Sequence, residues 1–149
     1  MKSFVDDKIA DDTAVDERLW GDPEVDADVE VDLIDDDPVA KTQLIAQAAD
    51  SLKAEEITAL DLRGLTIIAD FFVICTGNSS IQIRAITDRI EDRMRENGFR
   101  KLRKEGYQEA TWILLDYGDV VVHVMAAEQR AFYQIEAFWS EAPRLELDI

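Results

Sequence analysis

Residues 70–76 read D-F-F-V-I-C-T and constrain the fold more than any other stretch of the chain. The run is almost continuously apolar and is rich in residues with high β propensity. A strand with one face in water alternates apolar and polar side chains, whereas a run like this one is typical of a central strand covered on both faces. The rest of the chain must therefore supply neighbouring strands and covering layers.

Two amphipathic helices are predicted, one before this strand and one after it. Asp37-Pro38 suits an N-cap followed by proline at the first helical position, and apolar residues then recur at helical spacing over residues 38–54. Ser79 and Gln82 fit a capping box that begins a second helix, at about residues 79–97. The apolar stripe of the second helix consists of Ile83, Ile86, Ile90 and Met94.

Four further segments complete the predicted order of elements. Residues 57–62 and about 100–104 read as strands, and Tyr117-Gly118 joins two β-prone runs in a predicted hairpin. Residues 127–140 are predicted to form a helix rich in aromatic side chains. Helices interleaved with strands, including one hairpin, predict an α/β fold with a mixed sheet of about five strands flanked by helices.

The hairpin segment, W-I-L-L-D-Y-G-D-V-V-V-H-V-M at residues 112–125, bears most directly on function. If Asp116 pairs with Asp119, then Trp112 lies opposite His123, and one face of the hairpin is wholly apolar and faces the core. A slip of one residue would exchange the faces, and a longer loop would weaken the pairing. The second face mixes aromatic, aliphatic and acidic side chains: Trp112, Leu114, Asp116, Asp119, Val121, His123 and Met125.

Acidic charge is concentrated at the start of the chain. Residues 1–40 contain 15 acidic and 3 basic residues, a net charge of −12, whereas the other 109 residues hold 18 acidic and 13 basic residues, or −5. The apolar residues of the first part are scattered, so we expect residues 1–37 to form a disordered acidic arm ahead of a domain at residues 38–149. The arm either solvates the protein or lies on a basic partner, and the sequence leaves both open.

Composition also limits the compartment and the partners. The acidic N-terminus has neither the basic end nor the apolar run of a targeting signal, and no run of about 18 apolar residues could span a membrane. We therefore expect a cytoplasmic protein. A single cysteine, Cys75, excludes an intramolecular disulfide and a cysteine-cluster metal site. Basic residues gather only in the helix at 79–97 and the stretch at 100–104, so a basic protein partner is favoured over nucleic acid.

Three candidate sites for chemistry fail on composition or spacing. His123 lies on the order of 13 Å along the predicted sheet from Asp116 and Asp119, too far for one metal ion or a catalytic pair. T-G-N-S-S at residues 76–80 lacks the lysine and glycines of phosphate loops, so a turn with a helix cap is favoured over an anion site. Residues 38–149 contain no D-x-D pair for two-metal catalysis. The sequence therefore predicts no catalytic residue, no metal site and no cofactor.

Two alternatives remain open at the hairpin. His123 is either a structural histidine packed against Trp112 or a surface histidine within a binding patch. Asp116 and Asp119, if they face each other, repel, so we expect the pair either to be exposed or to be neutralised by a basic partner.

Four segments of the predicted domain match motifs of one known family. They are D-F-F-V-I-C-T-G-N-S-S at 70–80, E-G at 105–106, the hairpin at 112–125, and F-Y-Q-I-E-A-F-W at 132–139. Together they resemble the ribosomal silencing factor family, also called the RsfS or Iojap family, over about residues 41–143. The arm has no counterpart in the family pattern.

This resemblance implies a non-enzymatic protein whose α/β fold is related in shape to nucleotidyltransferases but lacks their catalytic carboxylates. It implies binding to the large ribosomal subunit through the basic ribosomal protein uL-fourteen, which blocks subunit joining and represses translation, notably when nutrients are short. Relatives in organelles are tied to large-subunit assembly, and homodimers off the ribosome are common. A large-subunit assembly factor is the first alternative, and an enzyme that kept nucleotidyltransferase activity is the second, against which the missing D-x-D counts. The residues expected to contact the ribosomal protein are Glu105, Tyr107, Trp112, Leu114, Asp116, Tyr117, Asp119 and His123.

Overall fold

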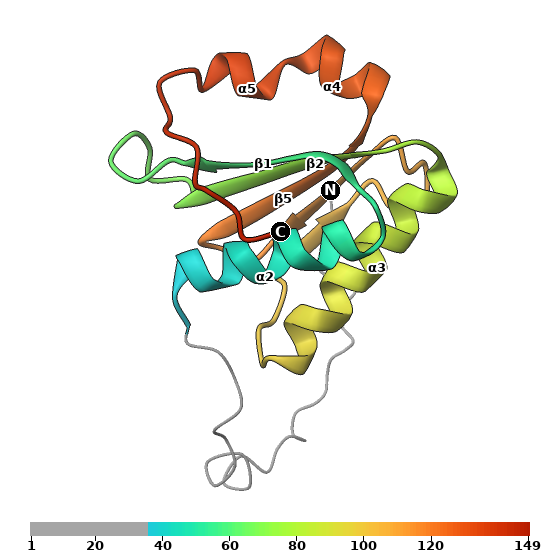
Figure 1. Cartoon of the computed structure of the whole chain (residues 1–149), viewed down its shortest axis with the longest axis horizontal. Helices are drawn as coiled ribbons and strands as arrows, with labels where there is room; N and C mark the ends of the chain where they lie inside the picture. Colours follow the sequence, from blue (N-terminus) through green and yellow to red (C-terminus); the bar gives the residue numbers. More distant parts are fainter. Residues whose placement is uncertain (1–35) are drawn as a thin grey trace, which may run out of the picture. The chain divides into compact units, whose positions relative to one another are not determined.

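The computed structural model describes residues 36–149, so the predicted acidic arm lies outside the described residues except for Asp36 and Asp37. The elements follow the predicted order, with the last helix divided in two (Figure 1). In chain order they are α2 (Pro38–Ser51), β1 (Glu55–Asp61), β2 (Phe71–Gly77), α3 (Ser80–Glu96), β3 (Arg103–Glu105), β4 (Trp112–Asp116), β5 (Val120–Ala126), α4 (Ala127–Tyr133) and α5 (Ile135–Phe138).

Strand β2 is covered on both faces, as its apolar run predicts. It pairs with β1 in the antiparallel and with β5 in the parallel orientation, in a five-stranded sheet of order β1-β2-β5-β4-β3. Helices α2 and α3 cover one face of the sheet, and α4 and α5 lie on the other (Figure 1). The prediction of a mixed α/β sheet flanked by helices is therefore confirmed.

Both predicted helix starts are confirmed by their caps. The side chain of Asp37 accepts a hydrogen bond from the backbone N–H of Ala40 at 3.3 Å. The Ser79 hydroxyl accepts one from the backbone N–H of Gln82 at 3.0 Å. The Gln82 side chain reaches back to the N–H of Asn78, not to that of Ser79 as in a standard capping box. The predicted stripe of α3 is buried in the core, with Ile83 1% exposed and Ile86, Ile90 and Met94 fully buried.

The predicted register of the hairpin is wrong by two residues. Trp112 pairs with Met125, not with His123. Because side chains alternate with a period of two along a strand, a shift of two residues leaves the side chains of β4 and β5 on their predicted faces. Asp119 is the exception, because it lies in the turn and bonds to Lys41 of α2. The apolar set of the hairpin packs on α2 and α3, and within the two strands only the predicted cross-strand partners change.

The turn of the hairpin explains this shift. The backbone N–H of Tyr117 donates to the carbonyl of Val120 at 2.9 Å, so Gly118 and Asp119 form the two-residue connection. Gly118 has a φ of +92°, a conformation that glycine adopts without strain. Asp116 therefore does not face Asp119, and the predicted repulsion between them does not arise.

The predicted helix at 127–140 is broken at Gln134, which takes the left-handed conformation with φ 49° and ψ 53°. The break separates α4 from α5 and lets Ile135 and Trp139 pack against the sheet. Their partners form a second apolar cluster, which contains Leu60, Leu62, Ile74, Met125 and Ala142. Tertiary packing here overrides a sequence pattern that favours one continuous helix.

The C-terminal segment closes one edge of the sheet. The backbone N–H of Asp61 donates to the carbonyl of Pro143 at 2.8 Å, and that of Leu145 donates to Ala59 at 2.9 Å. The side chain of Gln43 on α2 holds the segment further along, because its amide bonds the backbone at Glu146 and Asp148. The edge strand β1 is thus covered by the C-terminal segment over Ala59 to Asp61, where Leu60 and Arg144 form a bridge.

Two glycines with the same backbone angle allow a matched test of packing around β3 and β4. Gly64 and Gly106 both have a φ of +84°, but a Cβ on Gly64 would meet no atom within 4 Å, whereas one on Gly106 would collide with the carbonyl oxygen of Trp112. We expect Gly64→Ala to lower the free energy of unfolding by about 1–2 kcal/mol through backbone strain alone. Gly106→Ala should lower it by about 3 kcal/mol or more, because the collision adds to the strain.

Urea denaturation of both variants measures this difference. Equal losses for the two glycines would show that the loop before β4 moves away from the added methyl group, and would contradict close packing of Gly106 against Trp112.

Candidate functional site

The face of the sheet beneath α4 and α5 is covered over only part of its width. On β2 and β5, Ile74 and Met125 are fully buried beneath these helices. On β4, by contrast, Trp112 and Leu114 are half-buried. We call the uncovered part the open face. It consists of Arg103, Glu105, Trp112, Leu114 and Asp116, which the pairing of β3 with β4 brings onto one side.

Charges on the open face are arranged around one arginine. The Arg103 guanidinium lies 2.8 Å from the Glu105 carboxylate and 3.4 Å from that of Asp116. The second oxygen of Asp116 accepts the backbone N–H of Gly118 at 2.8 Å, which fixes its orientation. Leu114 lies opposite Glu105 and between Asp116 and Trp112 along β4. The face therefore offers an aliphatic centre bordered by oriented carboxylates.

Aromatic rings border the other end of the open face. The ring of Tyr133 on α4 lies 4.8 Å from that of Trp112, and the ring of Phe132 lies 4.9 Å from that of Tyr133. Phe132 is 77% exposed and Tyr133 is 51% exposed. These two residues and Arg103 are not among the site residues expected from the sequence. The segment F-Y-Q-I-E-A-F-W carried the signal for the aromatic pair, but only the fold places it beside β4.

His123 lies between the rings of Trp112 and Phe72 and has little exposed surface. It is 4% exposed, its Nδ1 accepts the indole N–H of Trp112 at 3.1 Å, and its ring lies 4.7 Å from that of Phe72. Burial lowers the pKa of His123 to about 4, so the ring is neutral at pH 7. The structural alternative is thus the correct one, and the expectation of a surface histidine is wrong.

Three other residues of the expected site, Tyr107, Tyr117 and Asp119, face the side of the sheet that α2 and α3 cover. Tyr117 is 7% exposed and belongs to the main core. Asp119 accepts two hydrogen bonds from the Lys41 ammonium of α2, at 3.1 and 3.2 Å. The hydroxyl of Tyr107 donates to Asp88 of α3 at 3.0 Å. These side chains are committed to contacts within the chain.

Of the eight expected residues, the structure therefore brings four together on the open face: Glu105, Trp112, Leu114 and Asp116. The acidic pair of the hairpin also has a different environment from either expected one. Asp116 faces Arg103 and Asp119 binds Lys41, so each carboxylate has a cation of its own chain beside it. The role of the eight residues in binding a partner stays a prediction.

T-G-N-S-S at residues 76–80 is built as a turn and cap. A Cβ on Gly77 would lie 2.7 Å from the side chain of Ile83, so a larger residue there would disturb the start of α3. The Asn78 amide bonds Glu55 at 3.1 Å, and the Gln82 amide bonds the carbonyl of Leu52 at 3.1 Å. These contacts tie α3 to β1 and the end of α2 and leave the turn a structural role.

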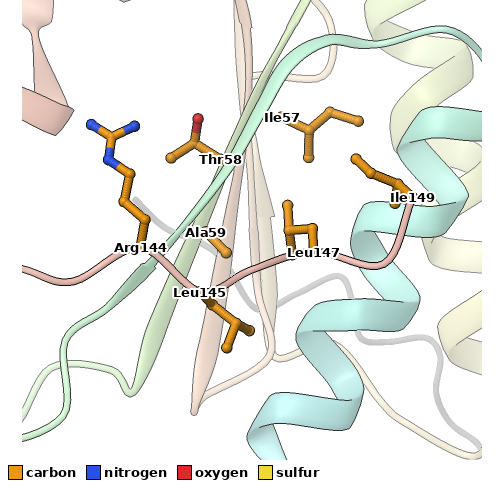
Figure 2. Close-up of a pocket in the computed structure, with 7 residues that line it drawn as sticks. All are labelled: Ile57, Thr58, Ala59, Arg144, Leu145, Leu147 and Ile149. Carbon is orange, nitrogen blue, oxygen red and sulfur yellow. The ribbon is translucent and has the colours of Figure 1, made fainter.

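Other features of the described chain offer no chemistry. A shallow hollow of about 350 Å³ lies between β1 and the C-terminal segment, and its lining is mostly aliphatic (Figure 2). Within residues 36–149, no group of three or more His, Cys, Asp and Glu side chains could hold a metal ion. No helix among the same residues is long and apolar enough to cross a membrane. The Cys75 thiol is fully buried, which raises its pKa to about 12 and makes it a poor nucleophile.

Comparisons with known proteins point to a single family. Residues 35–149 match the family described as ribosomal silencing factor during starvation. The Ribosomal silencing factor RsfS of Halalkalibacterium halodurans is 46% identical over 106 residues, which cover 71% of this chain and 91% of that protein. Protein Iojap, chloroplastic, of Zea mays is 41% identical over 103 residues, which cover 69% of this chain and 45% of that protein. A crystal structure of a protein from Chromobacterium violaceum is similar with a TM-score of 0.69 and 30% identity, and covers 76% of this chain and 93% of that one.

The titration of His123 tests its burial directly, because the chain has no other histidine. Its folded pKa of about 4 lies below the ordinary value of 6.5, so between these pH values the unfolded chain binds a proton that the folded chain does not. The stability that depends on a neutral His123 is therefore complete above pH 6.5 and is lost as the pH falls through 4. A shift of this size corresponds to about 3 kcal/mol.

We expect the imidazole C–H signals in proton NMR to titrate with a midpoint near 4. His123→Asn, which retains an acceptor for Trp112, should flatten the dependence of unfolding free energy on pH relative to the parent chain. A midpoint at or above the ordinary value would contradict the buried position.

Proposed function

The chain belongs to the ribosomal silencing factor family, and on that premise we propose that it binds the large ribosomal subunit, blocks its joining with the small subunit and so represses translation. The family match carries the proposal, because it extends over residues 35–149. The protein acts by occupying a surface, without catalysis, and nutrient limitation is the condition in which we expect it to matter.

The surface that we assign to this function is the open face, and the partner is the basic ribosomal protein uL-fourteen. Interfaces draw most of their binding energy from aromatic and aliphatic anchors at a desolvated centre, while charges steer the approach. Leu114 and Trp112 supply such anchors, and Glu105 and Asp116 supply acidic groups that suit a basic protein. Exposed Phe132 and Tyr133 extend the anchoring surface at the edge of this face.

A role in assembly of the large subunit is the second candidate, because the same docking surface would serve both functions. A pull-down from cell extract with the full chain separates them. Mature large subunits in the bound fraction favour silencing, and precursor subunits favour assembly.

We also infer that the protein acts in the cytoplasm, which fractionation of cells tests. We infer further that it forms homodimers off the ribosome, which light scattering tests.

Silencing predicts a direct effect on subunit joining. When the full chain is added to purified large and small subunits, the fraction of joined ribosomes in a sucrose gradient should fall as the protein saturates the large subunit. An unchanged fraction at saturating protein would refute silencing even if binding itself were observed.

The open face predicts a second set of outcomes. Leu114→Glu places a charge at its aliphatic centre and should weaken binding to the large subunit by about tenfold or more. Asp116→Asn retains the acceptor for Gly118 but removes the charge, so it should slow association and reduce the dependence of binding on salt.

Ile81→Glu is the matched control for Leu114→Glu. Ile81 is 76% exposed at the start of α3, on the opposite side of the sheet, so its replacement should leave binding unchanged. Thermal denaturation of each variant excludes loss of folding as the cause. Equal affinities of the Leu114→Glu variant and the parent would move the contact to another surface.

A further inference from the structure

The two short helices above the sheet contribute few fully buried residues. The only buried residue of α4 is Arg130, and α5 has none. Neither helix has a side-chain bond at its N-cap, and helices of seven and four residues have little intrinsic stability. Specific side-chain contacts must therefore determine where they lie.

Arg130 makes the most extensive of these contacts. Its Nε and Nη2 donate to both carboxylate oxygens of Glu136, at 3.0 and 2.7 Å. Its remaining bonds reach the sheet, with Nη1 donating to the hydroxyl of Thr76 at 2.9 Å and Nη2 to that of Thr58 at 3.3 Å. The Arg130 guanidinium also lowers the pKa of Glu136, so the carboxylate is charged at pH 7. A planar guanidinium with four such bonds has one orientation.

This ion pair spans the break between the helices. Arg130 lies in α4, Glu136 lies in α5, and Gln134 between them donates its backbone N–H to the carbonyl of Arg130 at 3.0 Å. Tyr133 is the last residue of α4, directly before the break. Because the pair fixes the chain on both sides of Tyr133 and ties it to β1 and β2, it also sets where the Tyr133 ring lies.

We propose that the Arg130–Glu136 ion pair is a positioning device that holds Tyr133 against Trp112 and so shapes the aromatic edge of the open face. This inference rests on the proposed function for its consequence in binding, but not for its structural part. Arg130 itself is 9% exposed and acts through Tyr133 without touching the partner.

An effect of the ion pair on the position of Tyr133 can be separated from its effect on stability. A buried ion pair is often no more stabilising than an apolar pair of similar size, so an apolar pair can replace its contribution to stability. Arg130→Met removes the cation that is hydrogen-bonded to Glu136 and should lower the melting temperature. The double variant Arg130→Met with Glu136→Leu removes the buried charge and should recover much of the melting temperature. It does not restore the directional bonds to Thr58 and Thr76.

The indole N–H of Trp112 reports on the position of Tyr133 without any ribosome. Its signal in a nitrogen–proton correlation spectrum of the full chain is assigned with Trp112→Phe, and Tyr133→Leu gives its position when the ring is absent. In Arg130→Met and in the double variant, we expect the signal to move toward the Tyr133→Leu position. Binding to the large subunit should weaken about tenfold in both.

Arg63→Met is the matched control. Arg63 also donates Nε and Nη2 to one carboxylate, that of Asp61, at 2.9 and 2.8 Å, but its side chain is 52% exposed at the end of β1. Its loss should leave the Trp112 signal in place and change binding less than twofold.

The proposal is overturned if the double variant regains the parent's Trp112 signal and affinity together with its melting temperature, because the pair would then only stabilise. It is also overturned if the signal does not move in Arg130→Met. If the parent chain does not bind large subunits, the proposed function fails, while the Trp112 signal still decides whether the pair positions Tyr133.

Discussion

The parallel pairing of β2 with β5 is the interaction on which the rest of the structure depends. Parallel neighbours at the centre of a sheet need a crossover between them, and their apolar side chains need cover on both faces. The crossover here contains α3, β3 and β4, and β4 then pairs with β5 on its other side. Among residues 36–149, two long helices cover one face, but only two short helices and the C-terminal segment remain for the other. The open face is what this unequal cover leaves exposed.

Sequence periodicity predicted the faces of the sheet well, because alternation along a strand survives an error of two residues. It could not predict the cross-strand partners, which depend on where the tight turn forms. Gly118 can take a positive φ at either of two turn positions, and in the structure it takes the first, with Tyr117 before it packed in the core. Gln134 also takes a left-handed conformation, but no glycine marks that position in the sequence. The conformation depends on contacts that reach across the sheet.

The expected site was partly predictable for the same reason. Residues at alternate positions of β4 were correctly placed together, since alternation alone decides their side. Asp119 was grouped with them by the predicted register, but it lies in the turn and bonds to Lys41 of α2. Tyr107 and Tyr117 were grouped with them as neighbours in the sequence, but Tyr107 bonds to α3 and Tyr117 packs in the main core. The aromatic residues of α4 come close to β4 only through the fold. Burial, which removed His123 from the surface, likewise depends on which face α4 and α5 cover.

The closure of one sheet edge limits how copies of this domain could join. Among the described residues, β3 ends the sheet on one side, while the C-terminal segment lies on β1 at the other. An extended sheet grows from molecule to molecule only if each copy offers two bonding edges. A domain with a single available edge stops the growth of such a sheet. When two copies pair through that edge, no edge is left for a third molecule. The C-terminal segment therefore reduces the part of β1 that is free to pair with a strand of another copy.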